Sequence, residues 1–322
     1  MNQLSTVNQV TVIDCAEPGV TPADALGPLV NDGVVVLRNV FPAASVDEVF
    51  ARAKRYLAQP AIAGSPGYYK IDHPKKLLDP CVLGGPVYDL LLDERVINVA
   101  EKCLGSECVM AEMNLKYDAP VKYSYFAHHT DFWAGWQKKE NSKPVLTEED
   151  LRQPIGIGGA IYLHETHEGA FCYCLGSHKR VVKLGQQDLS KVPEPERSAI
   201  LARRVRIDGK KGDLVLFDDR GYHGPDQPST KERTVILIDY YKIATFGRRI
   251  VTPYAVWVTD IVRLTPRQLK VLGVGAESWG DQWTTLHAKF GRNPLHRWIA
   301  RAIERAYLHR HLRATLRAWL RR

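Results

Sequence analysis

The sequence predicts a mainly β fold, a jelly roll with flanking helices, followed by an amphipathic helical tail at the C-terminus. Between residues 107 and 242 the chain is a succession of short strand-like runs separated by Gly and Pro turns, which is typical of jelly rolls. Helical spacing before this region and near the C-terminus predicts the remaining elements. With 322 residues, 45% hydrophobic and 25% charged, the chain can bury a full core.

The helices expected to support the jelly roll lie within residues 43–104. A short β-branched strand, Val34–Leu37, precedes them. The segment Ser45–Glu48 has the pattern of a capping box that begins a helix, and apolar residues at helical spacing follow it. Residues 86–104 return to helical spacing, and Gly105 is expected to end that helix.

A polar insertion at residues 134–153 interrupts the strand region. A stretch of this length without a strand pattern is uncommon inside a compact domain unless it forms a lid or a binding loop. It directly follows the candidate metal motif described next, so we expect a lid loop over that motif. Strands resume at Ile155, and the predicted catalytic domain covers residues 1–245. Residues 246–322 form a C-terminal extension.

Three side chains form a candidate metal site: His129 and Asp131 in one short motif, and His223 far downstream. Two imidazoles and one carboxylate are the ligand set of the non-haem ferrous facial triad, which leaves coordination positions open for chemistry. The spacing of His129 and Asp131 suits the end of a strand, where side chains at i and i+2 share a face.

Arg233 lies ten residues after His223 and opens the apolar strand 232–240. A metal ligand on one strand and an arginine at the start of the next suit an enzyme that uses 2-oxoglutarate. The keto acid chelates the metal through one end, and its far carboxylate is matched by a guanidinium group.

These motifs, taken together and in this order, resemble the phytanoyl-CoA dioxygenase family of Fe(II)/2-oxoglutarate oxygenases. The resemblance covers roughly residues 28–242. Two positions depart from the usual family pattern: Thr130, where Gln is common, and Leu175, where Pro is common. The matching segments are Asp32–Phe41, His129 with Asp131, Glu168–Phe171, Leu175–Lys179, Gly212–Phe217, His223-Gly224 and Arg233.

The resemblance implies a double-stranded β-helix and the cofactors Fe(II), 2-oxoglutarate and O2. It implies that His129, Asp131 and His223 hold iron and that Arg233 binds 2-oxoglutarate. Polar residues on the strand before the motif often contact the co-substrate in this family, so Lys116 is a further candidate contact. We also assign Thr130, which lies between two ligands, to the cofactor-binding residues.

The reaction that the resemblance implies is hydroxylation of an unactivated C–H bond in a small-molecule or lipid-linked substrate, with release of succinate and CO2. Family members that halogenate have a small residue in place of Asp131, so hydroxylation or a related oxidation such as desaturation is favoured here. Two alternatives stay open. One is a zinc-type hydrolase or lyase on the same ligands, and the other is a non-catalytic, membrane-docked jelly-roll adaptor.

The net charge of +8 is concentrated in the C-terminal extension. From Lys289 onward there are ten Lys or Arg residues and one acidic residue, Glu304, so the first 288 residues are close to neutral. Asn293-Pro294 predicts a helix start, and two basic amphipathic segments follow. Such helices suit peripheral contact with an anionic membrane or docking on the body or on a second subunit, as in a homo-oligomer. No nucleic-acid partner is expected, because no reader motif is present.

The predicted location is the cytoplasm, with association at the inner membrane surface if the tail binds lipid. No apolar run is long enough to span a bilayer, and residues 1–7 lack the features of a signal peptide. The six cysteines are scattered, as expected for reduced thiols. Cys172 and Cys174 are expected to be buried and free rather than a zinc or redox site.

Overall fold

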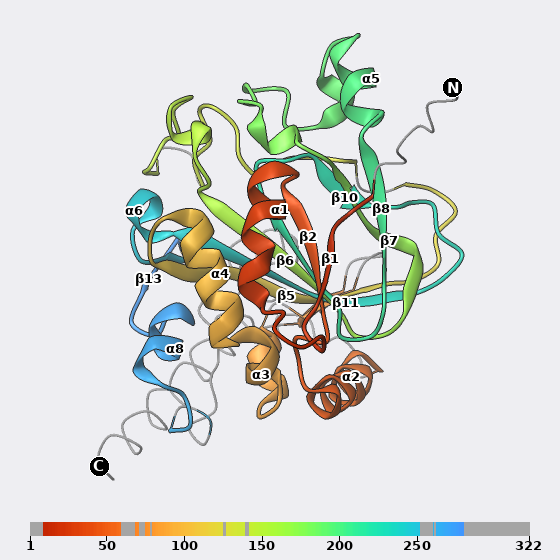
Figure 1. Cartoon of the computed structure of the whole chain (residues 1–322), viewed down its shortest axis with the longest axis vertical. Helices are drawn as coiled ribbons and strands as arrows, with labels where there is room; N and C mark the ends of the chain where they lie inside the picture. Colours follow the sequence, from red (N-terminus) through yellow and green to blue (C-terminus); the bar gives the residue numbers. More distant parts are fainter. Residues whose placement is uncertain are drawn as a thin grey trace, which may run out of the picture.

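The computed structural model describes residues 9–58, 68–70, 75–77, 79–124, 127–138, 142–251, 260 and 262–279. Its fold is mainly β with flanking helices, as predicted (Figure 1). An eight-stranded sheet faces a three-stranded sheet, in the manner of a jelly roll. The large sheet has the order β1 (Val12–Asp14), β2 (Val34–Arg38), β9 (Leu214–Asp218), β6 (Gly156–Tyr162), β11 (Arg233–Lys242), β5 (Cys108–Asp118), β4 (Lys75–Leu77) and β3 (Tyr68–Lys70).

The small sheet has the order β10 (His223–Pro225), β7 (Thr166–Cys174) and β8 (Arg204–Gly209). A short parallel pair, β12 (Arg249–Ile250) with β13 (Glu277–Ser278), lies near the C-terminal end of the described chain. The 3-10 turns are η1 (Pro22–Ala25), η2 (Pro80–Leu83), η3 (Asp150–Arg152), η4 (Ser177–Lys179) and η5 (Leu189–Lys191). The helices are α1 (Leu26–Asn31), α2 (Ala43–Ala58), α3 (Val87–Leu91), α4 (Glu94–Leu104), α5 (Glu196–Leu201), α6 (Ile243–Phe246) and α8 (Pro266–Val271).

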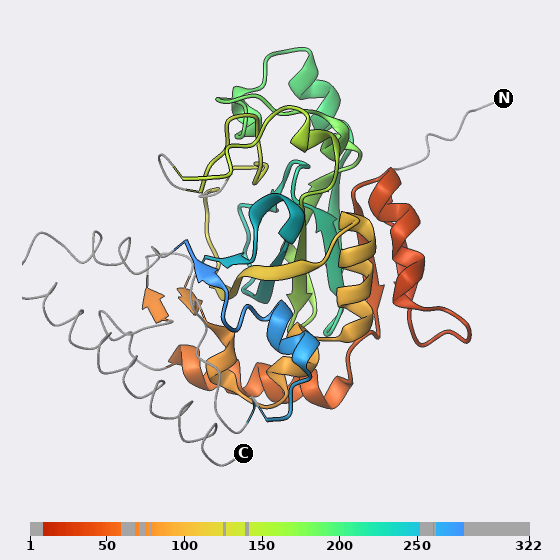
Figure 2. The same cartoon turned by 90° about the vertical axis from the view of Figure 1, so that its left-hand side faces the viewer.

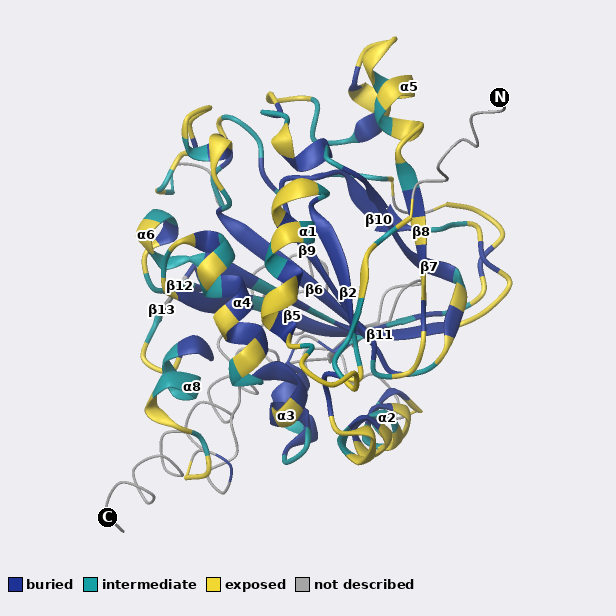
Figure 3. Cartoon of the chain, viewed as in Figure 1, coloured by how far each residue is buried: buried dark blue, intermediate teal, exposed yellow. Residues whose placement is uncertain are grey.

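The large sheet is buried on both faces, which is why its strands β2, β9 and β6 are almost wholly apolar (Figure 3). On one face, α1 to α4 cover a core that includes Leu37, Val99 and Ile238. On the other face, side chains such as Val36 and Phe217 pack against the small sheet. The site described below lies between the two sheets, so both cores hold its strands in place.

The helical support has the predicted location but not the predicted start. Helix α2 begins at Ala43, and the amide of Val46 already donates to the Pro42 carbonyl at 3.2 Å. The prediction of a capping box at Ser45 was therefore wrong: the Ser45 hydroxyl donates to the Asp89 carboxylate instead. Helix α4 ends as predicted at Gly105, which has a left-handed conformation with φ 61°.

The first part of the C-terminal extension packs on the body. Phe246, Ile250 and Trp279 are buried in one cluster with Phe132, and Leu272 belongs to the core under the helices. In Figure 2 the blue segments α8 and β13 lie beside the end of β5. The basic helices predicted after Lys289 lie outside the described residues, as do the contacts proposed for them. Among the helices that the structure describes, none is long and apolar enough to cross a membrane.

Candidate active site

Backbone pairing joins the two distant histidines. The amide of His129 donates to the His223 carbonyl at 2.9 Å, and the amide of His223 donates to the His129 carbonyl at 2.8 Å. This reciprocal pair places both side chains on the same side, with ring centroids 4.6 Å apart. Asp131, two residues along, is held by its amide, which donates to the Asp219 carbonyl at 3.0 Å.

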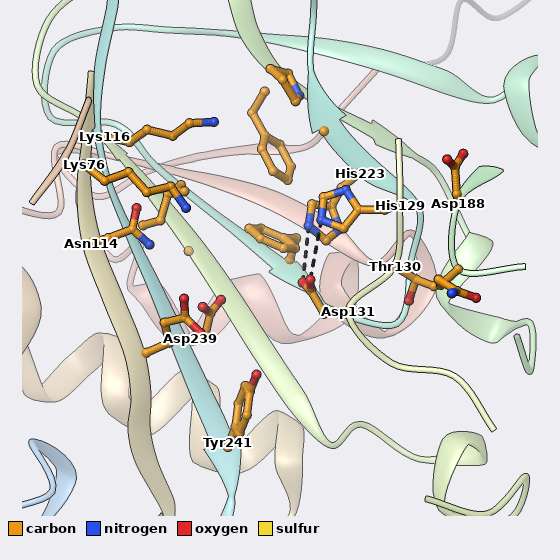
Figure 4. A pocket seen from close by; sticks show the side chains of 18 of the residues that line it. Lys76, Asn114, Lys116, His129, Thr130, Asp131, Asp188, His223, Asp239 and Tyr241 are labelled. Carbon is orange, nitrogen blue, oxygen red and sulfur yellow. Dashed lines mark ion pairs between the residues drawn. The ribbon is translucent and has the colours of Figure 1, made fainter. Parts of the chain in front are cut away.

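The three side chains converge with the orientation that a metal site needs. The Nδ1 atoms of His129 and His223 lie 3.2 Å from the Ala127 carbonyl and 3.0 Å from the Gly221 carbonyl, respectively. Both Nε2 atoms therefore turn toward Asp131, at 3.5 Å and 3.3 Å from its carboxylate oxygens (Figure 4). The three ligand atoms lie within 4.8 Å of one another. A carbonyl on the second ring nitrogen fixes the tautomer in which Nε2 is free to bind a metal ion.

The electrostatics of the three side chains also suit a cation. Burial lowers the pKa of His223 to about 4, which keeps its imidazole neutral. Burial opposes the charged form of His129, but the hydrogen bond to Asp131, the charge of Asp131 and the Ala127 carbonyl together outweigh it and raise the pKa of His129. Burial likewise opposes ionisation of Asp131, yet the two imidazoles hold its pKa below the usual value. An ionised carboxylate therefore lies next to two imidazole nitrogens, as expected for a set of metal ligands.

A cavity of about 680 Å³ opens beside these ligands, between the two sheets. Its floor is the paired strands β5 and β11, and side chains of alternating positions on both strands line it. The pairs in register are Asp118 with Arg233, Asn114 with Leu237, and Glu112 with Asp239. Between Asp239 and Tyr240 the register shifts by one residue of β5, a bulge of the kind found next to active sites.

One end of the floor is basic. Lys76, Lys116 and Arg233 line it, and Lys116 lies 3.5 Å from Asp118. Arg233 is 4% exposed, and its Nε and Nη2 donate to Asp118 Oδ2 at 2.9 Å and 2.5 Å. Burial lowers the pKa of Lys116 to about 7, against the opposing influence of Asp118. The structure thus brings the predicted residues Lys116 and Arg233 together at one end of the cavity.

The opposite end of the floor is acidic and aromatic. Glu112 and Asp239 line it together with Tyr241, Trp133 and Trp136. Figure 4 shows Asp239 and Tyr241 on the side of the cavity away from Lys76 and Lys116. Burial, and then the neighbouring Glu112 and Asp131, raise the pKa of Asp239 well above its ordinary value.

The hydroxyl of Thr130 is engaged with the backbone. Its hydroxyl lies 3.1 Å from the Phe132 carbonyl and 3.0 Å from the Asp219 carbonyl, and the side chain is 2% exposed. The Asp219 carboxylate packs against β6, where a Cβ at Gly158 would come within 2.4 Å of its Oδ1. Thr130 also lines the cavity, and its assignment to the cofactor-binding residues stays a prediction.

The predicted lid loop lies beside the acidic end. Trp133 and Trp136 line the cavity, and Lys138 reaches the Glu112 carboxylate at 3.4 Å. The loop closes on itself where the Gly135 amide donates to the Leu146 carbonyl and the Leu146 amide to the Trp136 carbonyl, at 2.8 and 2.9 Å. Cys172 and Cys174 are buried and free, as predicted.

Sequence reasoning missed Asp118, Glu112 and Asp239. The signal for two of them was present, because Glu112 and Asp118 lie an even number of residues from Lys116 on the same strand and therefore share its face. Asp239 lies six residues after Arg233 on the same strand, which also gives it the same face.

Two facing sheets, a His/Asp/His cluster and a cavity with a buried arginine define the fold and site of a non-haem iron oxygenase. The profile of the phytanoyl-CoA dioxygenase (PhyH) family matches residues 29–235, and the chain belongs to that family. It is an Fe(II)- and 2-oxoglutarate-dependent oxygenase.

Curated relatives include two proteins named ectoine dioxygenase. The one from Nocardia farcinica is 22% identical over 64% of this chain and 72% of its own length. The one from Bordetella bronchiseptica is 26% identical over 63% of this chain and 69% of its own length. A crystal structure of EctD from S. alaskensis with 2-oxoglutarate and 5-hydroxyectoine is similar in fold, with a TM-score of 0.55 and 22% identity, covering 85% of this chain and 90% of that one.

Proposed function

We propose that this oxygenase hydroxylates an unactivated C–H bond of a small molecule, with His129, Asp131 and His223 as the iron ligands. The observation that carries the proposal is the convergence of the two Nε2 atoms and the Asp131 carboxylate, with both Nδ1 atoms held by carbonyl groups. When bound, iron and 2-oxoglutarate supply dioxygen activation, with succinate and CO2 as by-products. The chain itself binds and orients these groups.

Arg233 and Lys116 are the residues that we propose hold the distal carboxylate of 2-oxoglutarate. Both line the basic end of the cavity, and Asp118 fixes the guanidinium group by two hydrogen bonds. Lys76 adds a third positive charge, so this end carries an excess of positive charge suited to a dianion. Asp118 supplies one negative charge to this group of cations, and a dianionic co-substrate would supply two more.

Membership in an oxygenase family favours this function over a zinc hydrolase or a non-catalytic adaptor. The carboxylate ligand Asp131 fills the position that halogenation would require open, which supports hydroxylation. The lipid-linked substrate, membrane contact and homo-oligomer stay predictions, because they depend on the basic helices outside the described residues. Ectoine is the first compound to test, since two relatives are named for it.

The test is oxygen-dependent turnover by the purified chain. The protein is loaded anaerobically with Fe(II) and 2-oxoglutarate, mixed with a cell extract or with ectoine, and exposed to O2. We expect succinate and a product heavier by one oxygen atom, both lost in Asp131→Ala and in Arg233→Leu. His167→Ala is the matched control, because that histidine lies on the surface with 61% of its side chain exposed. Retained turnover in Asp131→Ala would refute the assignment of the ligands.

A further inference from the structure

Two carboxylates face each other at the acidic end of the cavity floor. Glu112 on β5 and Asp239 on β11 are paired in register, and both line the cavity. Like charges directly opposite one another on neighbouring strands destabilise a sheet. Asp131, the proposed iron ligand, adds a further negative charge and is among the groups that raise the pKa of Asp239. In the free protein burial and this repulsion disfavour the charged form of Asp239, and a positive group between Glu112 and Asp239 would offset both.

The one lysine described at this end is a partial counter-charge. Lys138 lies 3.4 Å from the Glu112 carboxylate, at a distance where the bond is weak, and about a quarter of each side chain is exposed. It belongs to the lid loop rather than to the floor. A ligand cation would therefore compete with Lys138 for the Glu112 carboxylate.

The surroundings of the carboxylate pair are those of a cation site. Trp133, Trp136 and Tyr241 line the same cavity, and Tyr241 lies two residues after Asp239 on β11, so apolar ring edges border the space in which a cation with a carbon skeleton would lie. Independently, Asn114 is 4% exposed, lines the cavity, and its Oδ1 accepts no hydrogen bond from the protein. Asn114 is paired with Leu237, and this pair lies two residues along the strands from the pair of Glu112 and Asp239. A buried amide oxygen in this position calls for an N–H donor from a ligand.

We propose that the substrate carries a cationic nitrogen, an ammonium or guanidinium group, bound between Glu112 and Asp239 with Asn114 Oδ1 as a further acceptor. The proposal rests on the proposed function, because it concerns the substrate of the same site. The floor then has two charged ends: Lys116 and Arg233 receive the dianionic co-substrate, and the carboxylates receive the cation. Four residues of an extended strand separate Lys116 from Glu112, about 13 Å. That distance leaves room for the metal-bound co-substrate and for a small substrate beside it.

The test measures the binding of small probes to the full-length, metal-free protein by isothermal titration calorimetry. The probes are 1,4-diaminobutane, the uncharged 1,4-butanediol of similar length, and glutarate, which probes the basic end. We expect the diamine to bind at least about tenfold more tightly than the diol. Asp239→Asn and Glu112→Gln, which keep the side-chain shapes, should each weaken diamine binding by at least about fivefold and leave glutarate binding unchanged.

Two further variants separate a local effect from a change in net charge. Lys138→Met should strengthen diamine binding, because it removes the competing ammonium group. Asp188→Asn removes another cavity carboxylate, beyond His129 in Figure 4, and should leave diamine binding as in the wild type. Equal affinities for diamine and diol, or diamine affinity unchanged in both Asp239→Asn and Glu112→Gln, would overturn the proposal. Failure of the proposed function has a different signature: glutarate would bind equally well to wild type and to Arg233→Leu, and no succinate would be released in the turnover assay.

Discussion

Asp118 holds Arg233 through a single carboxylate oxygen, which accepts hydrogen bonds from both Nε and Nη2. The two residues are also direct partners in the ladder between β5 and β11. Each is less than a tenth exposed, so neither charge is compensated by water. The pair fixes the direction of the guanidinium group at the basic end of the cavity before any co-substrate arrives.

Asp118→Asn should destabilise the protein and increase the stabilisation that a bound dianion gives. Removing one partner of a buried ion pair leaves Arg233 and Lys116 uncompensated, at a cost of about 2–4 kcal/mol in the free energy of unfolding. Saturating glutarate supplies the missing charge and should raise the melting temperature of the variant more than that of the wild type. Asp208→Asn, whose side chain is 40% exposed, is the control and should change stability by less than about 1 kcal/mol. Equal glutarate-induced shifts in wild type and Asp118→Asn would contradict the role given to this pair.

The affinity for glutarate should fall as the pH rises above about 7. Lys116 in the free protein has a pKa of about 7, lowered mainly by burial, so it loses its proton just above neutrality. A dianion binds the protonated form, and the affinity should therefore decrease by up to about tenfold per pH unit above that pKa. Titration calorimetry between pH 6.5 and pH 9 is the measurement. Lys116→Met should show a flatter profile, and parallel profiles for the two proteins would exclude Lys116 from this end of the site.

Metal affinity should fall in acid. The pKa of His129 is raised by Asp131, so this imidazole still carries a proton at a pH where an ordinary histidine has lost it. Fe(II) or Ni(II) must displace that proton, and binding should release it and weaken as the pH falls below the pKa of His129. Anaerobic titrations at pH 6 and pH 8 measure the difference, with proton release read from the dependence of the heat on the buffer. His129→Ala should bind the metal weakly at either pH, whereas His167→Ala should behave as the wild type.

Trp279→Ala should cost about 3–5 kcal/mol of stability, as expected for a large aromatic side chain lost from a core. Trp279 is 7% exposed and packs against Tyr241 and Phe246, with ring centroids 6.1 Å from each. Val262→Ala, at a residue 59% exposed in the same extension, should change stability by less than about 0.5 kcal/mol. Urea denaturation gives both values. Similar stabilities for Trp279→Ala and the wild type would mean that the extension does not support the body.

Much of the site was predictable from residue types and their order. His129, Asp131 and His223 have the right chemistry at a recognisable spacing, and the structure brings them together by a backbone pair that no spacing could specify. Lys116 was expected from the resemblance, as a polar residue on the strand before the motif. Glu112 lies on the same face of that strand, but its importance depends on Asp239, which lies more than one hundred residues away in the sequence.

The parts that could not be predicted depend on long-range contacts. The bulge between β5 and β11 leaves no trace in the alternation of the sequence, because one skipped residue looks like ordinary irregularity. Ser45 had the residue type of a helix cap, yet the helix starts earlier because the Pro42 carbonyl accepts the first helical hydrogen bond. The burial of Phe246 and Trp279 arises from packing against Phe132, and local periodicity carries no information about it.

Alternate residues of the floor strands face the cavity and the core, and this limits how the enzyme can diversify. On β11, Arg233, Leu237 and Asp239 line the cavity, while Ile236 and Ile238 belong to the core under the helices. Inserting or deleting a single residue within the strand would exchange these two sets and place charges in the apolar core. New specificities on this scaffold should therefore arise by substitution along β5 and β11, and by changes in length only in the loops that border them.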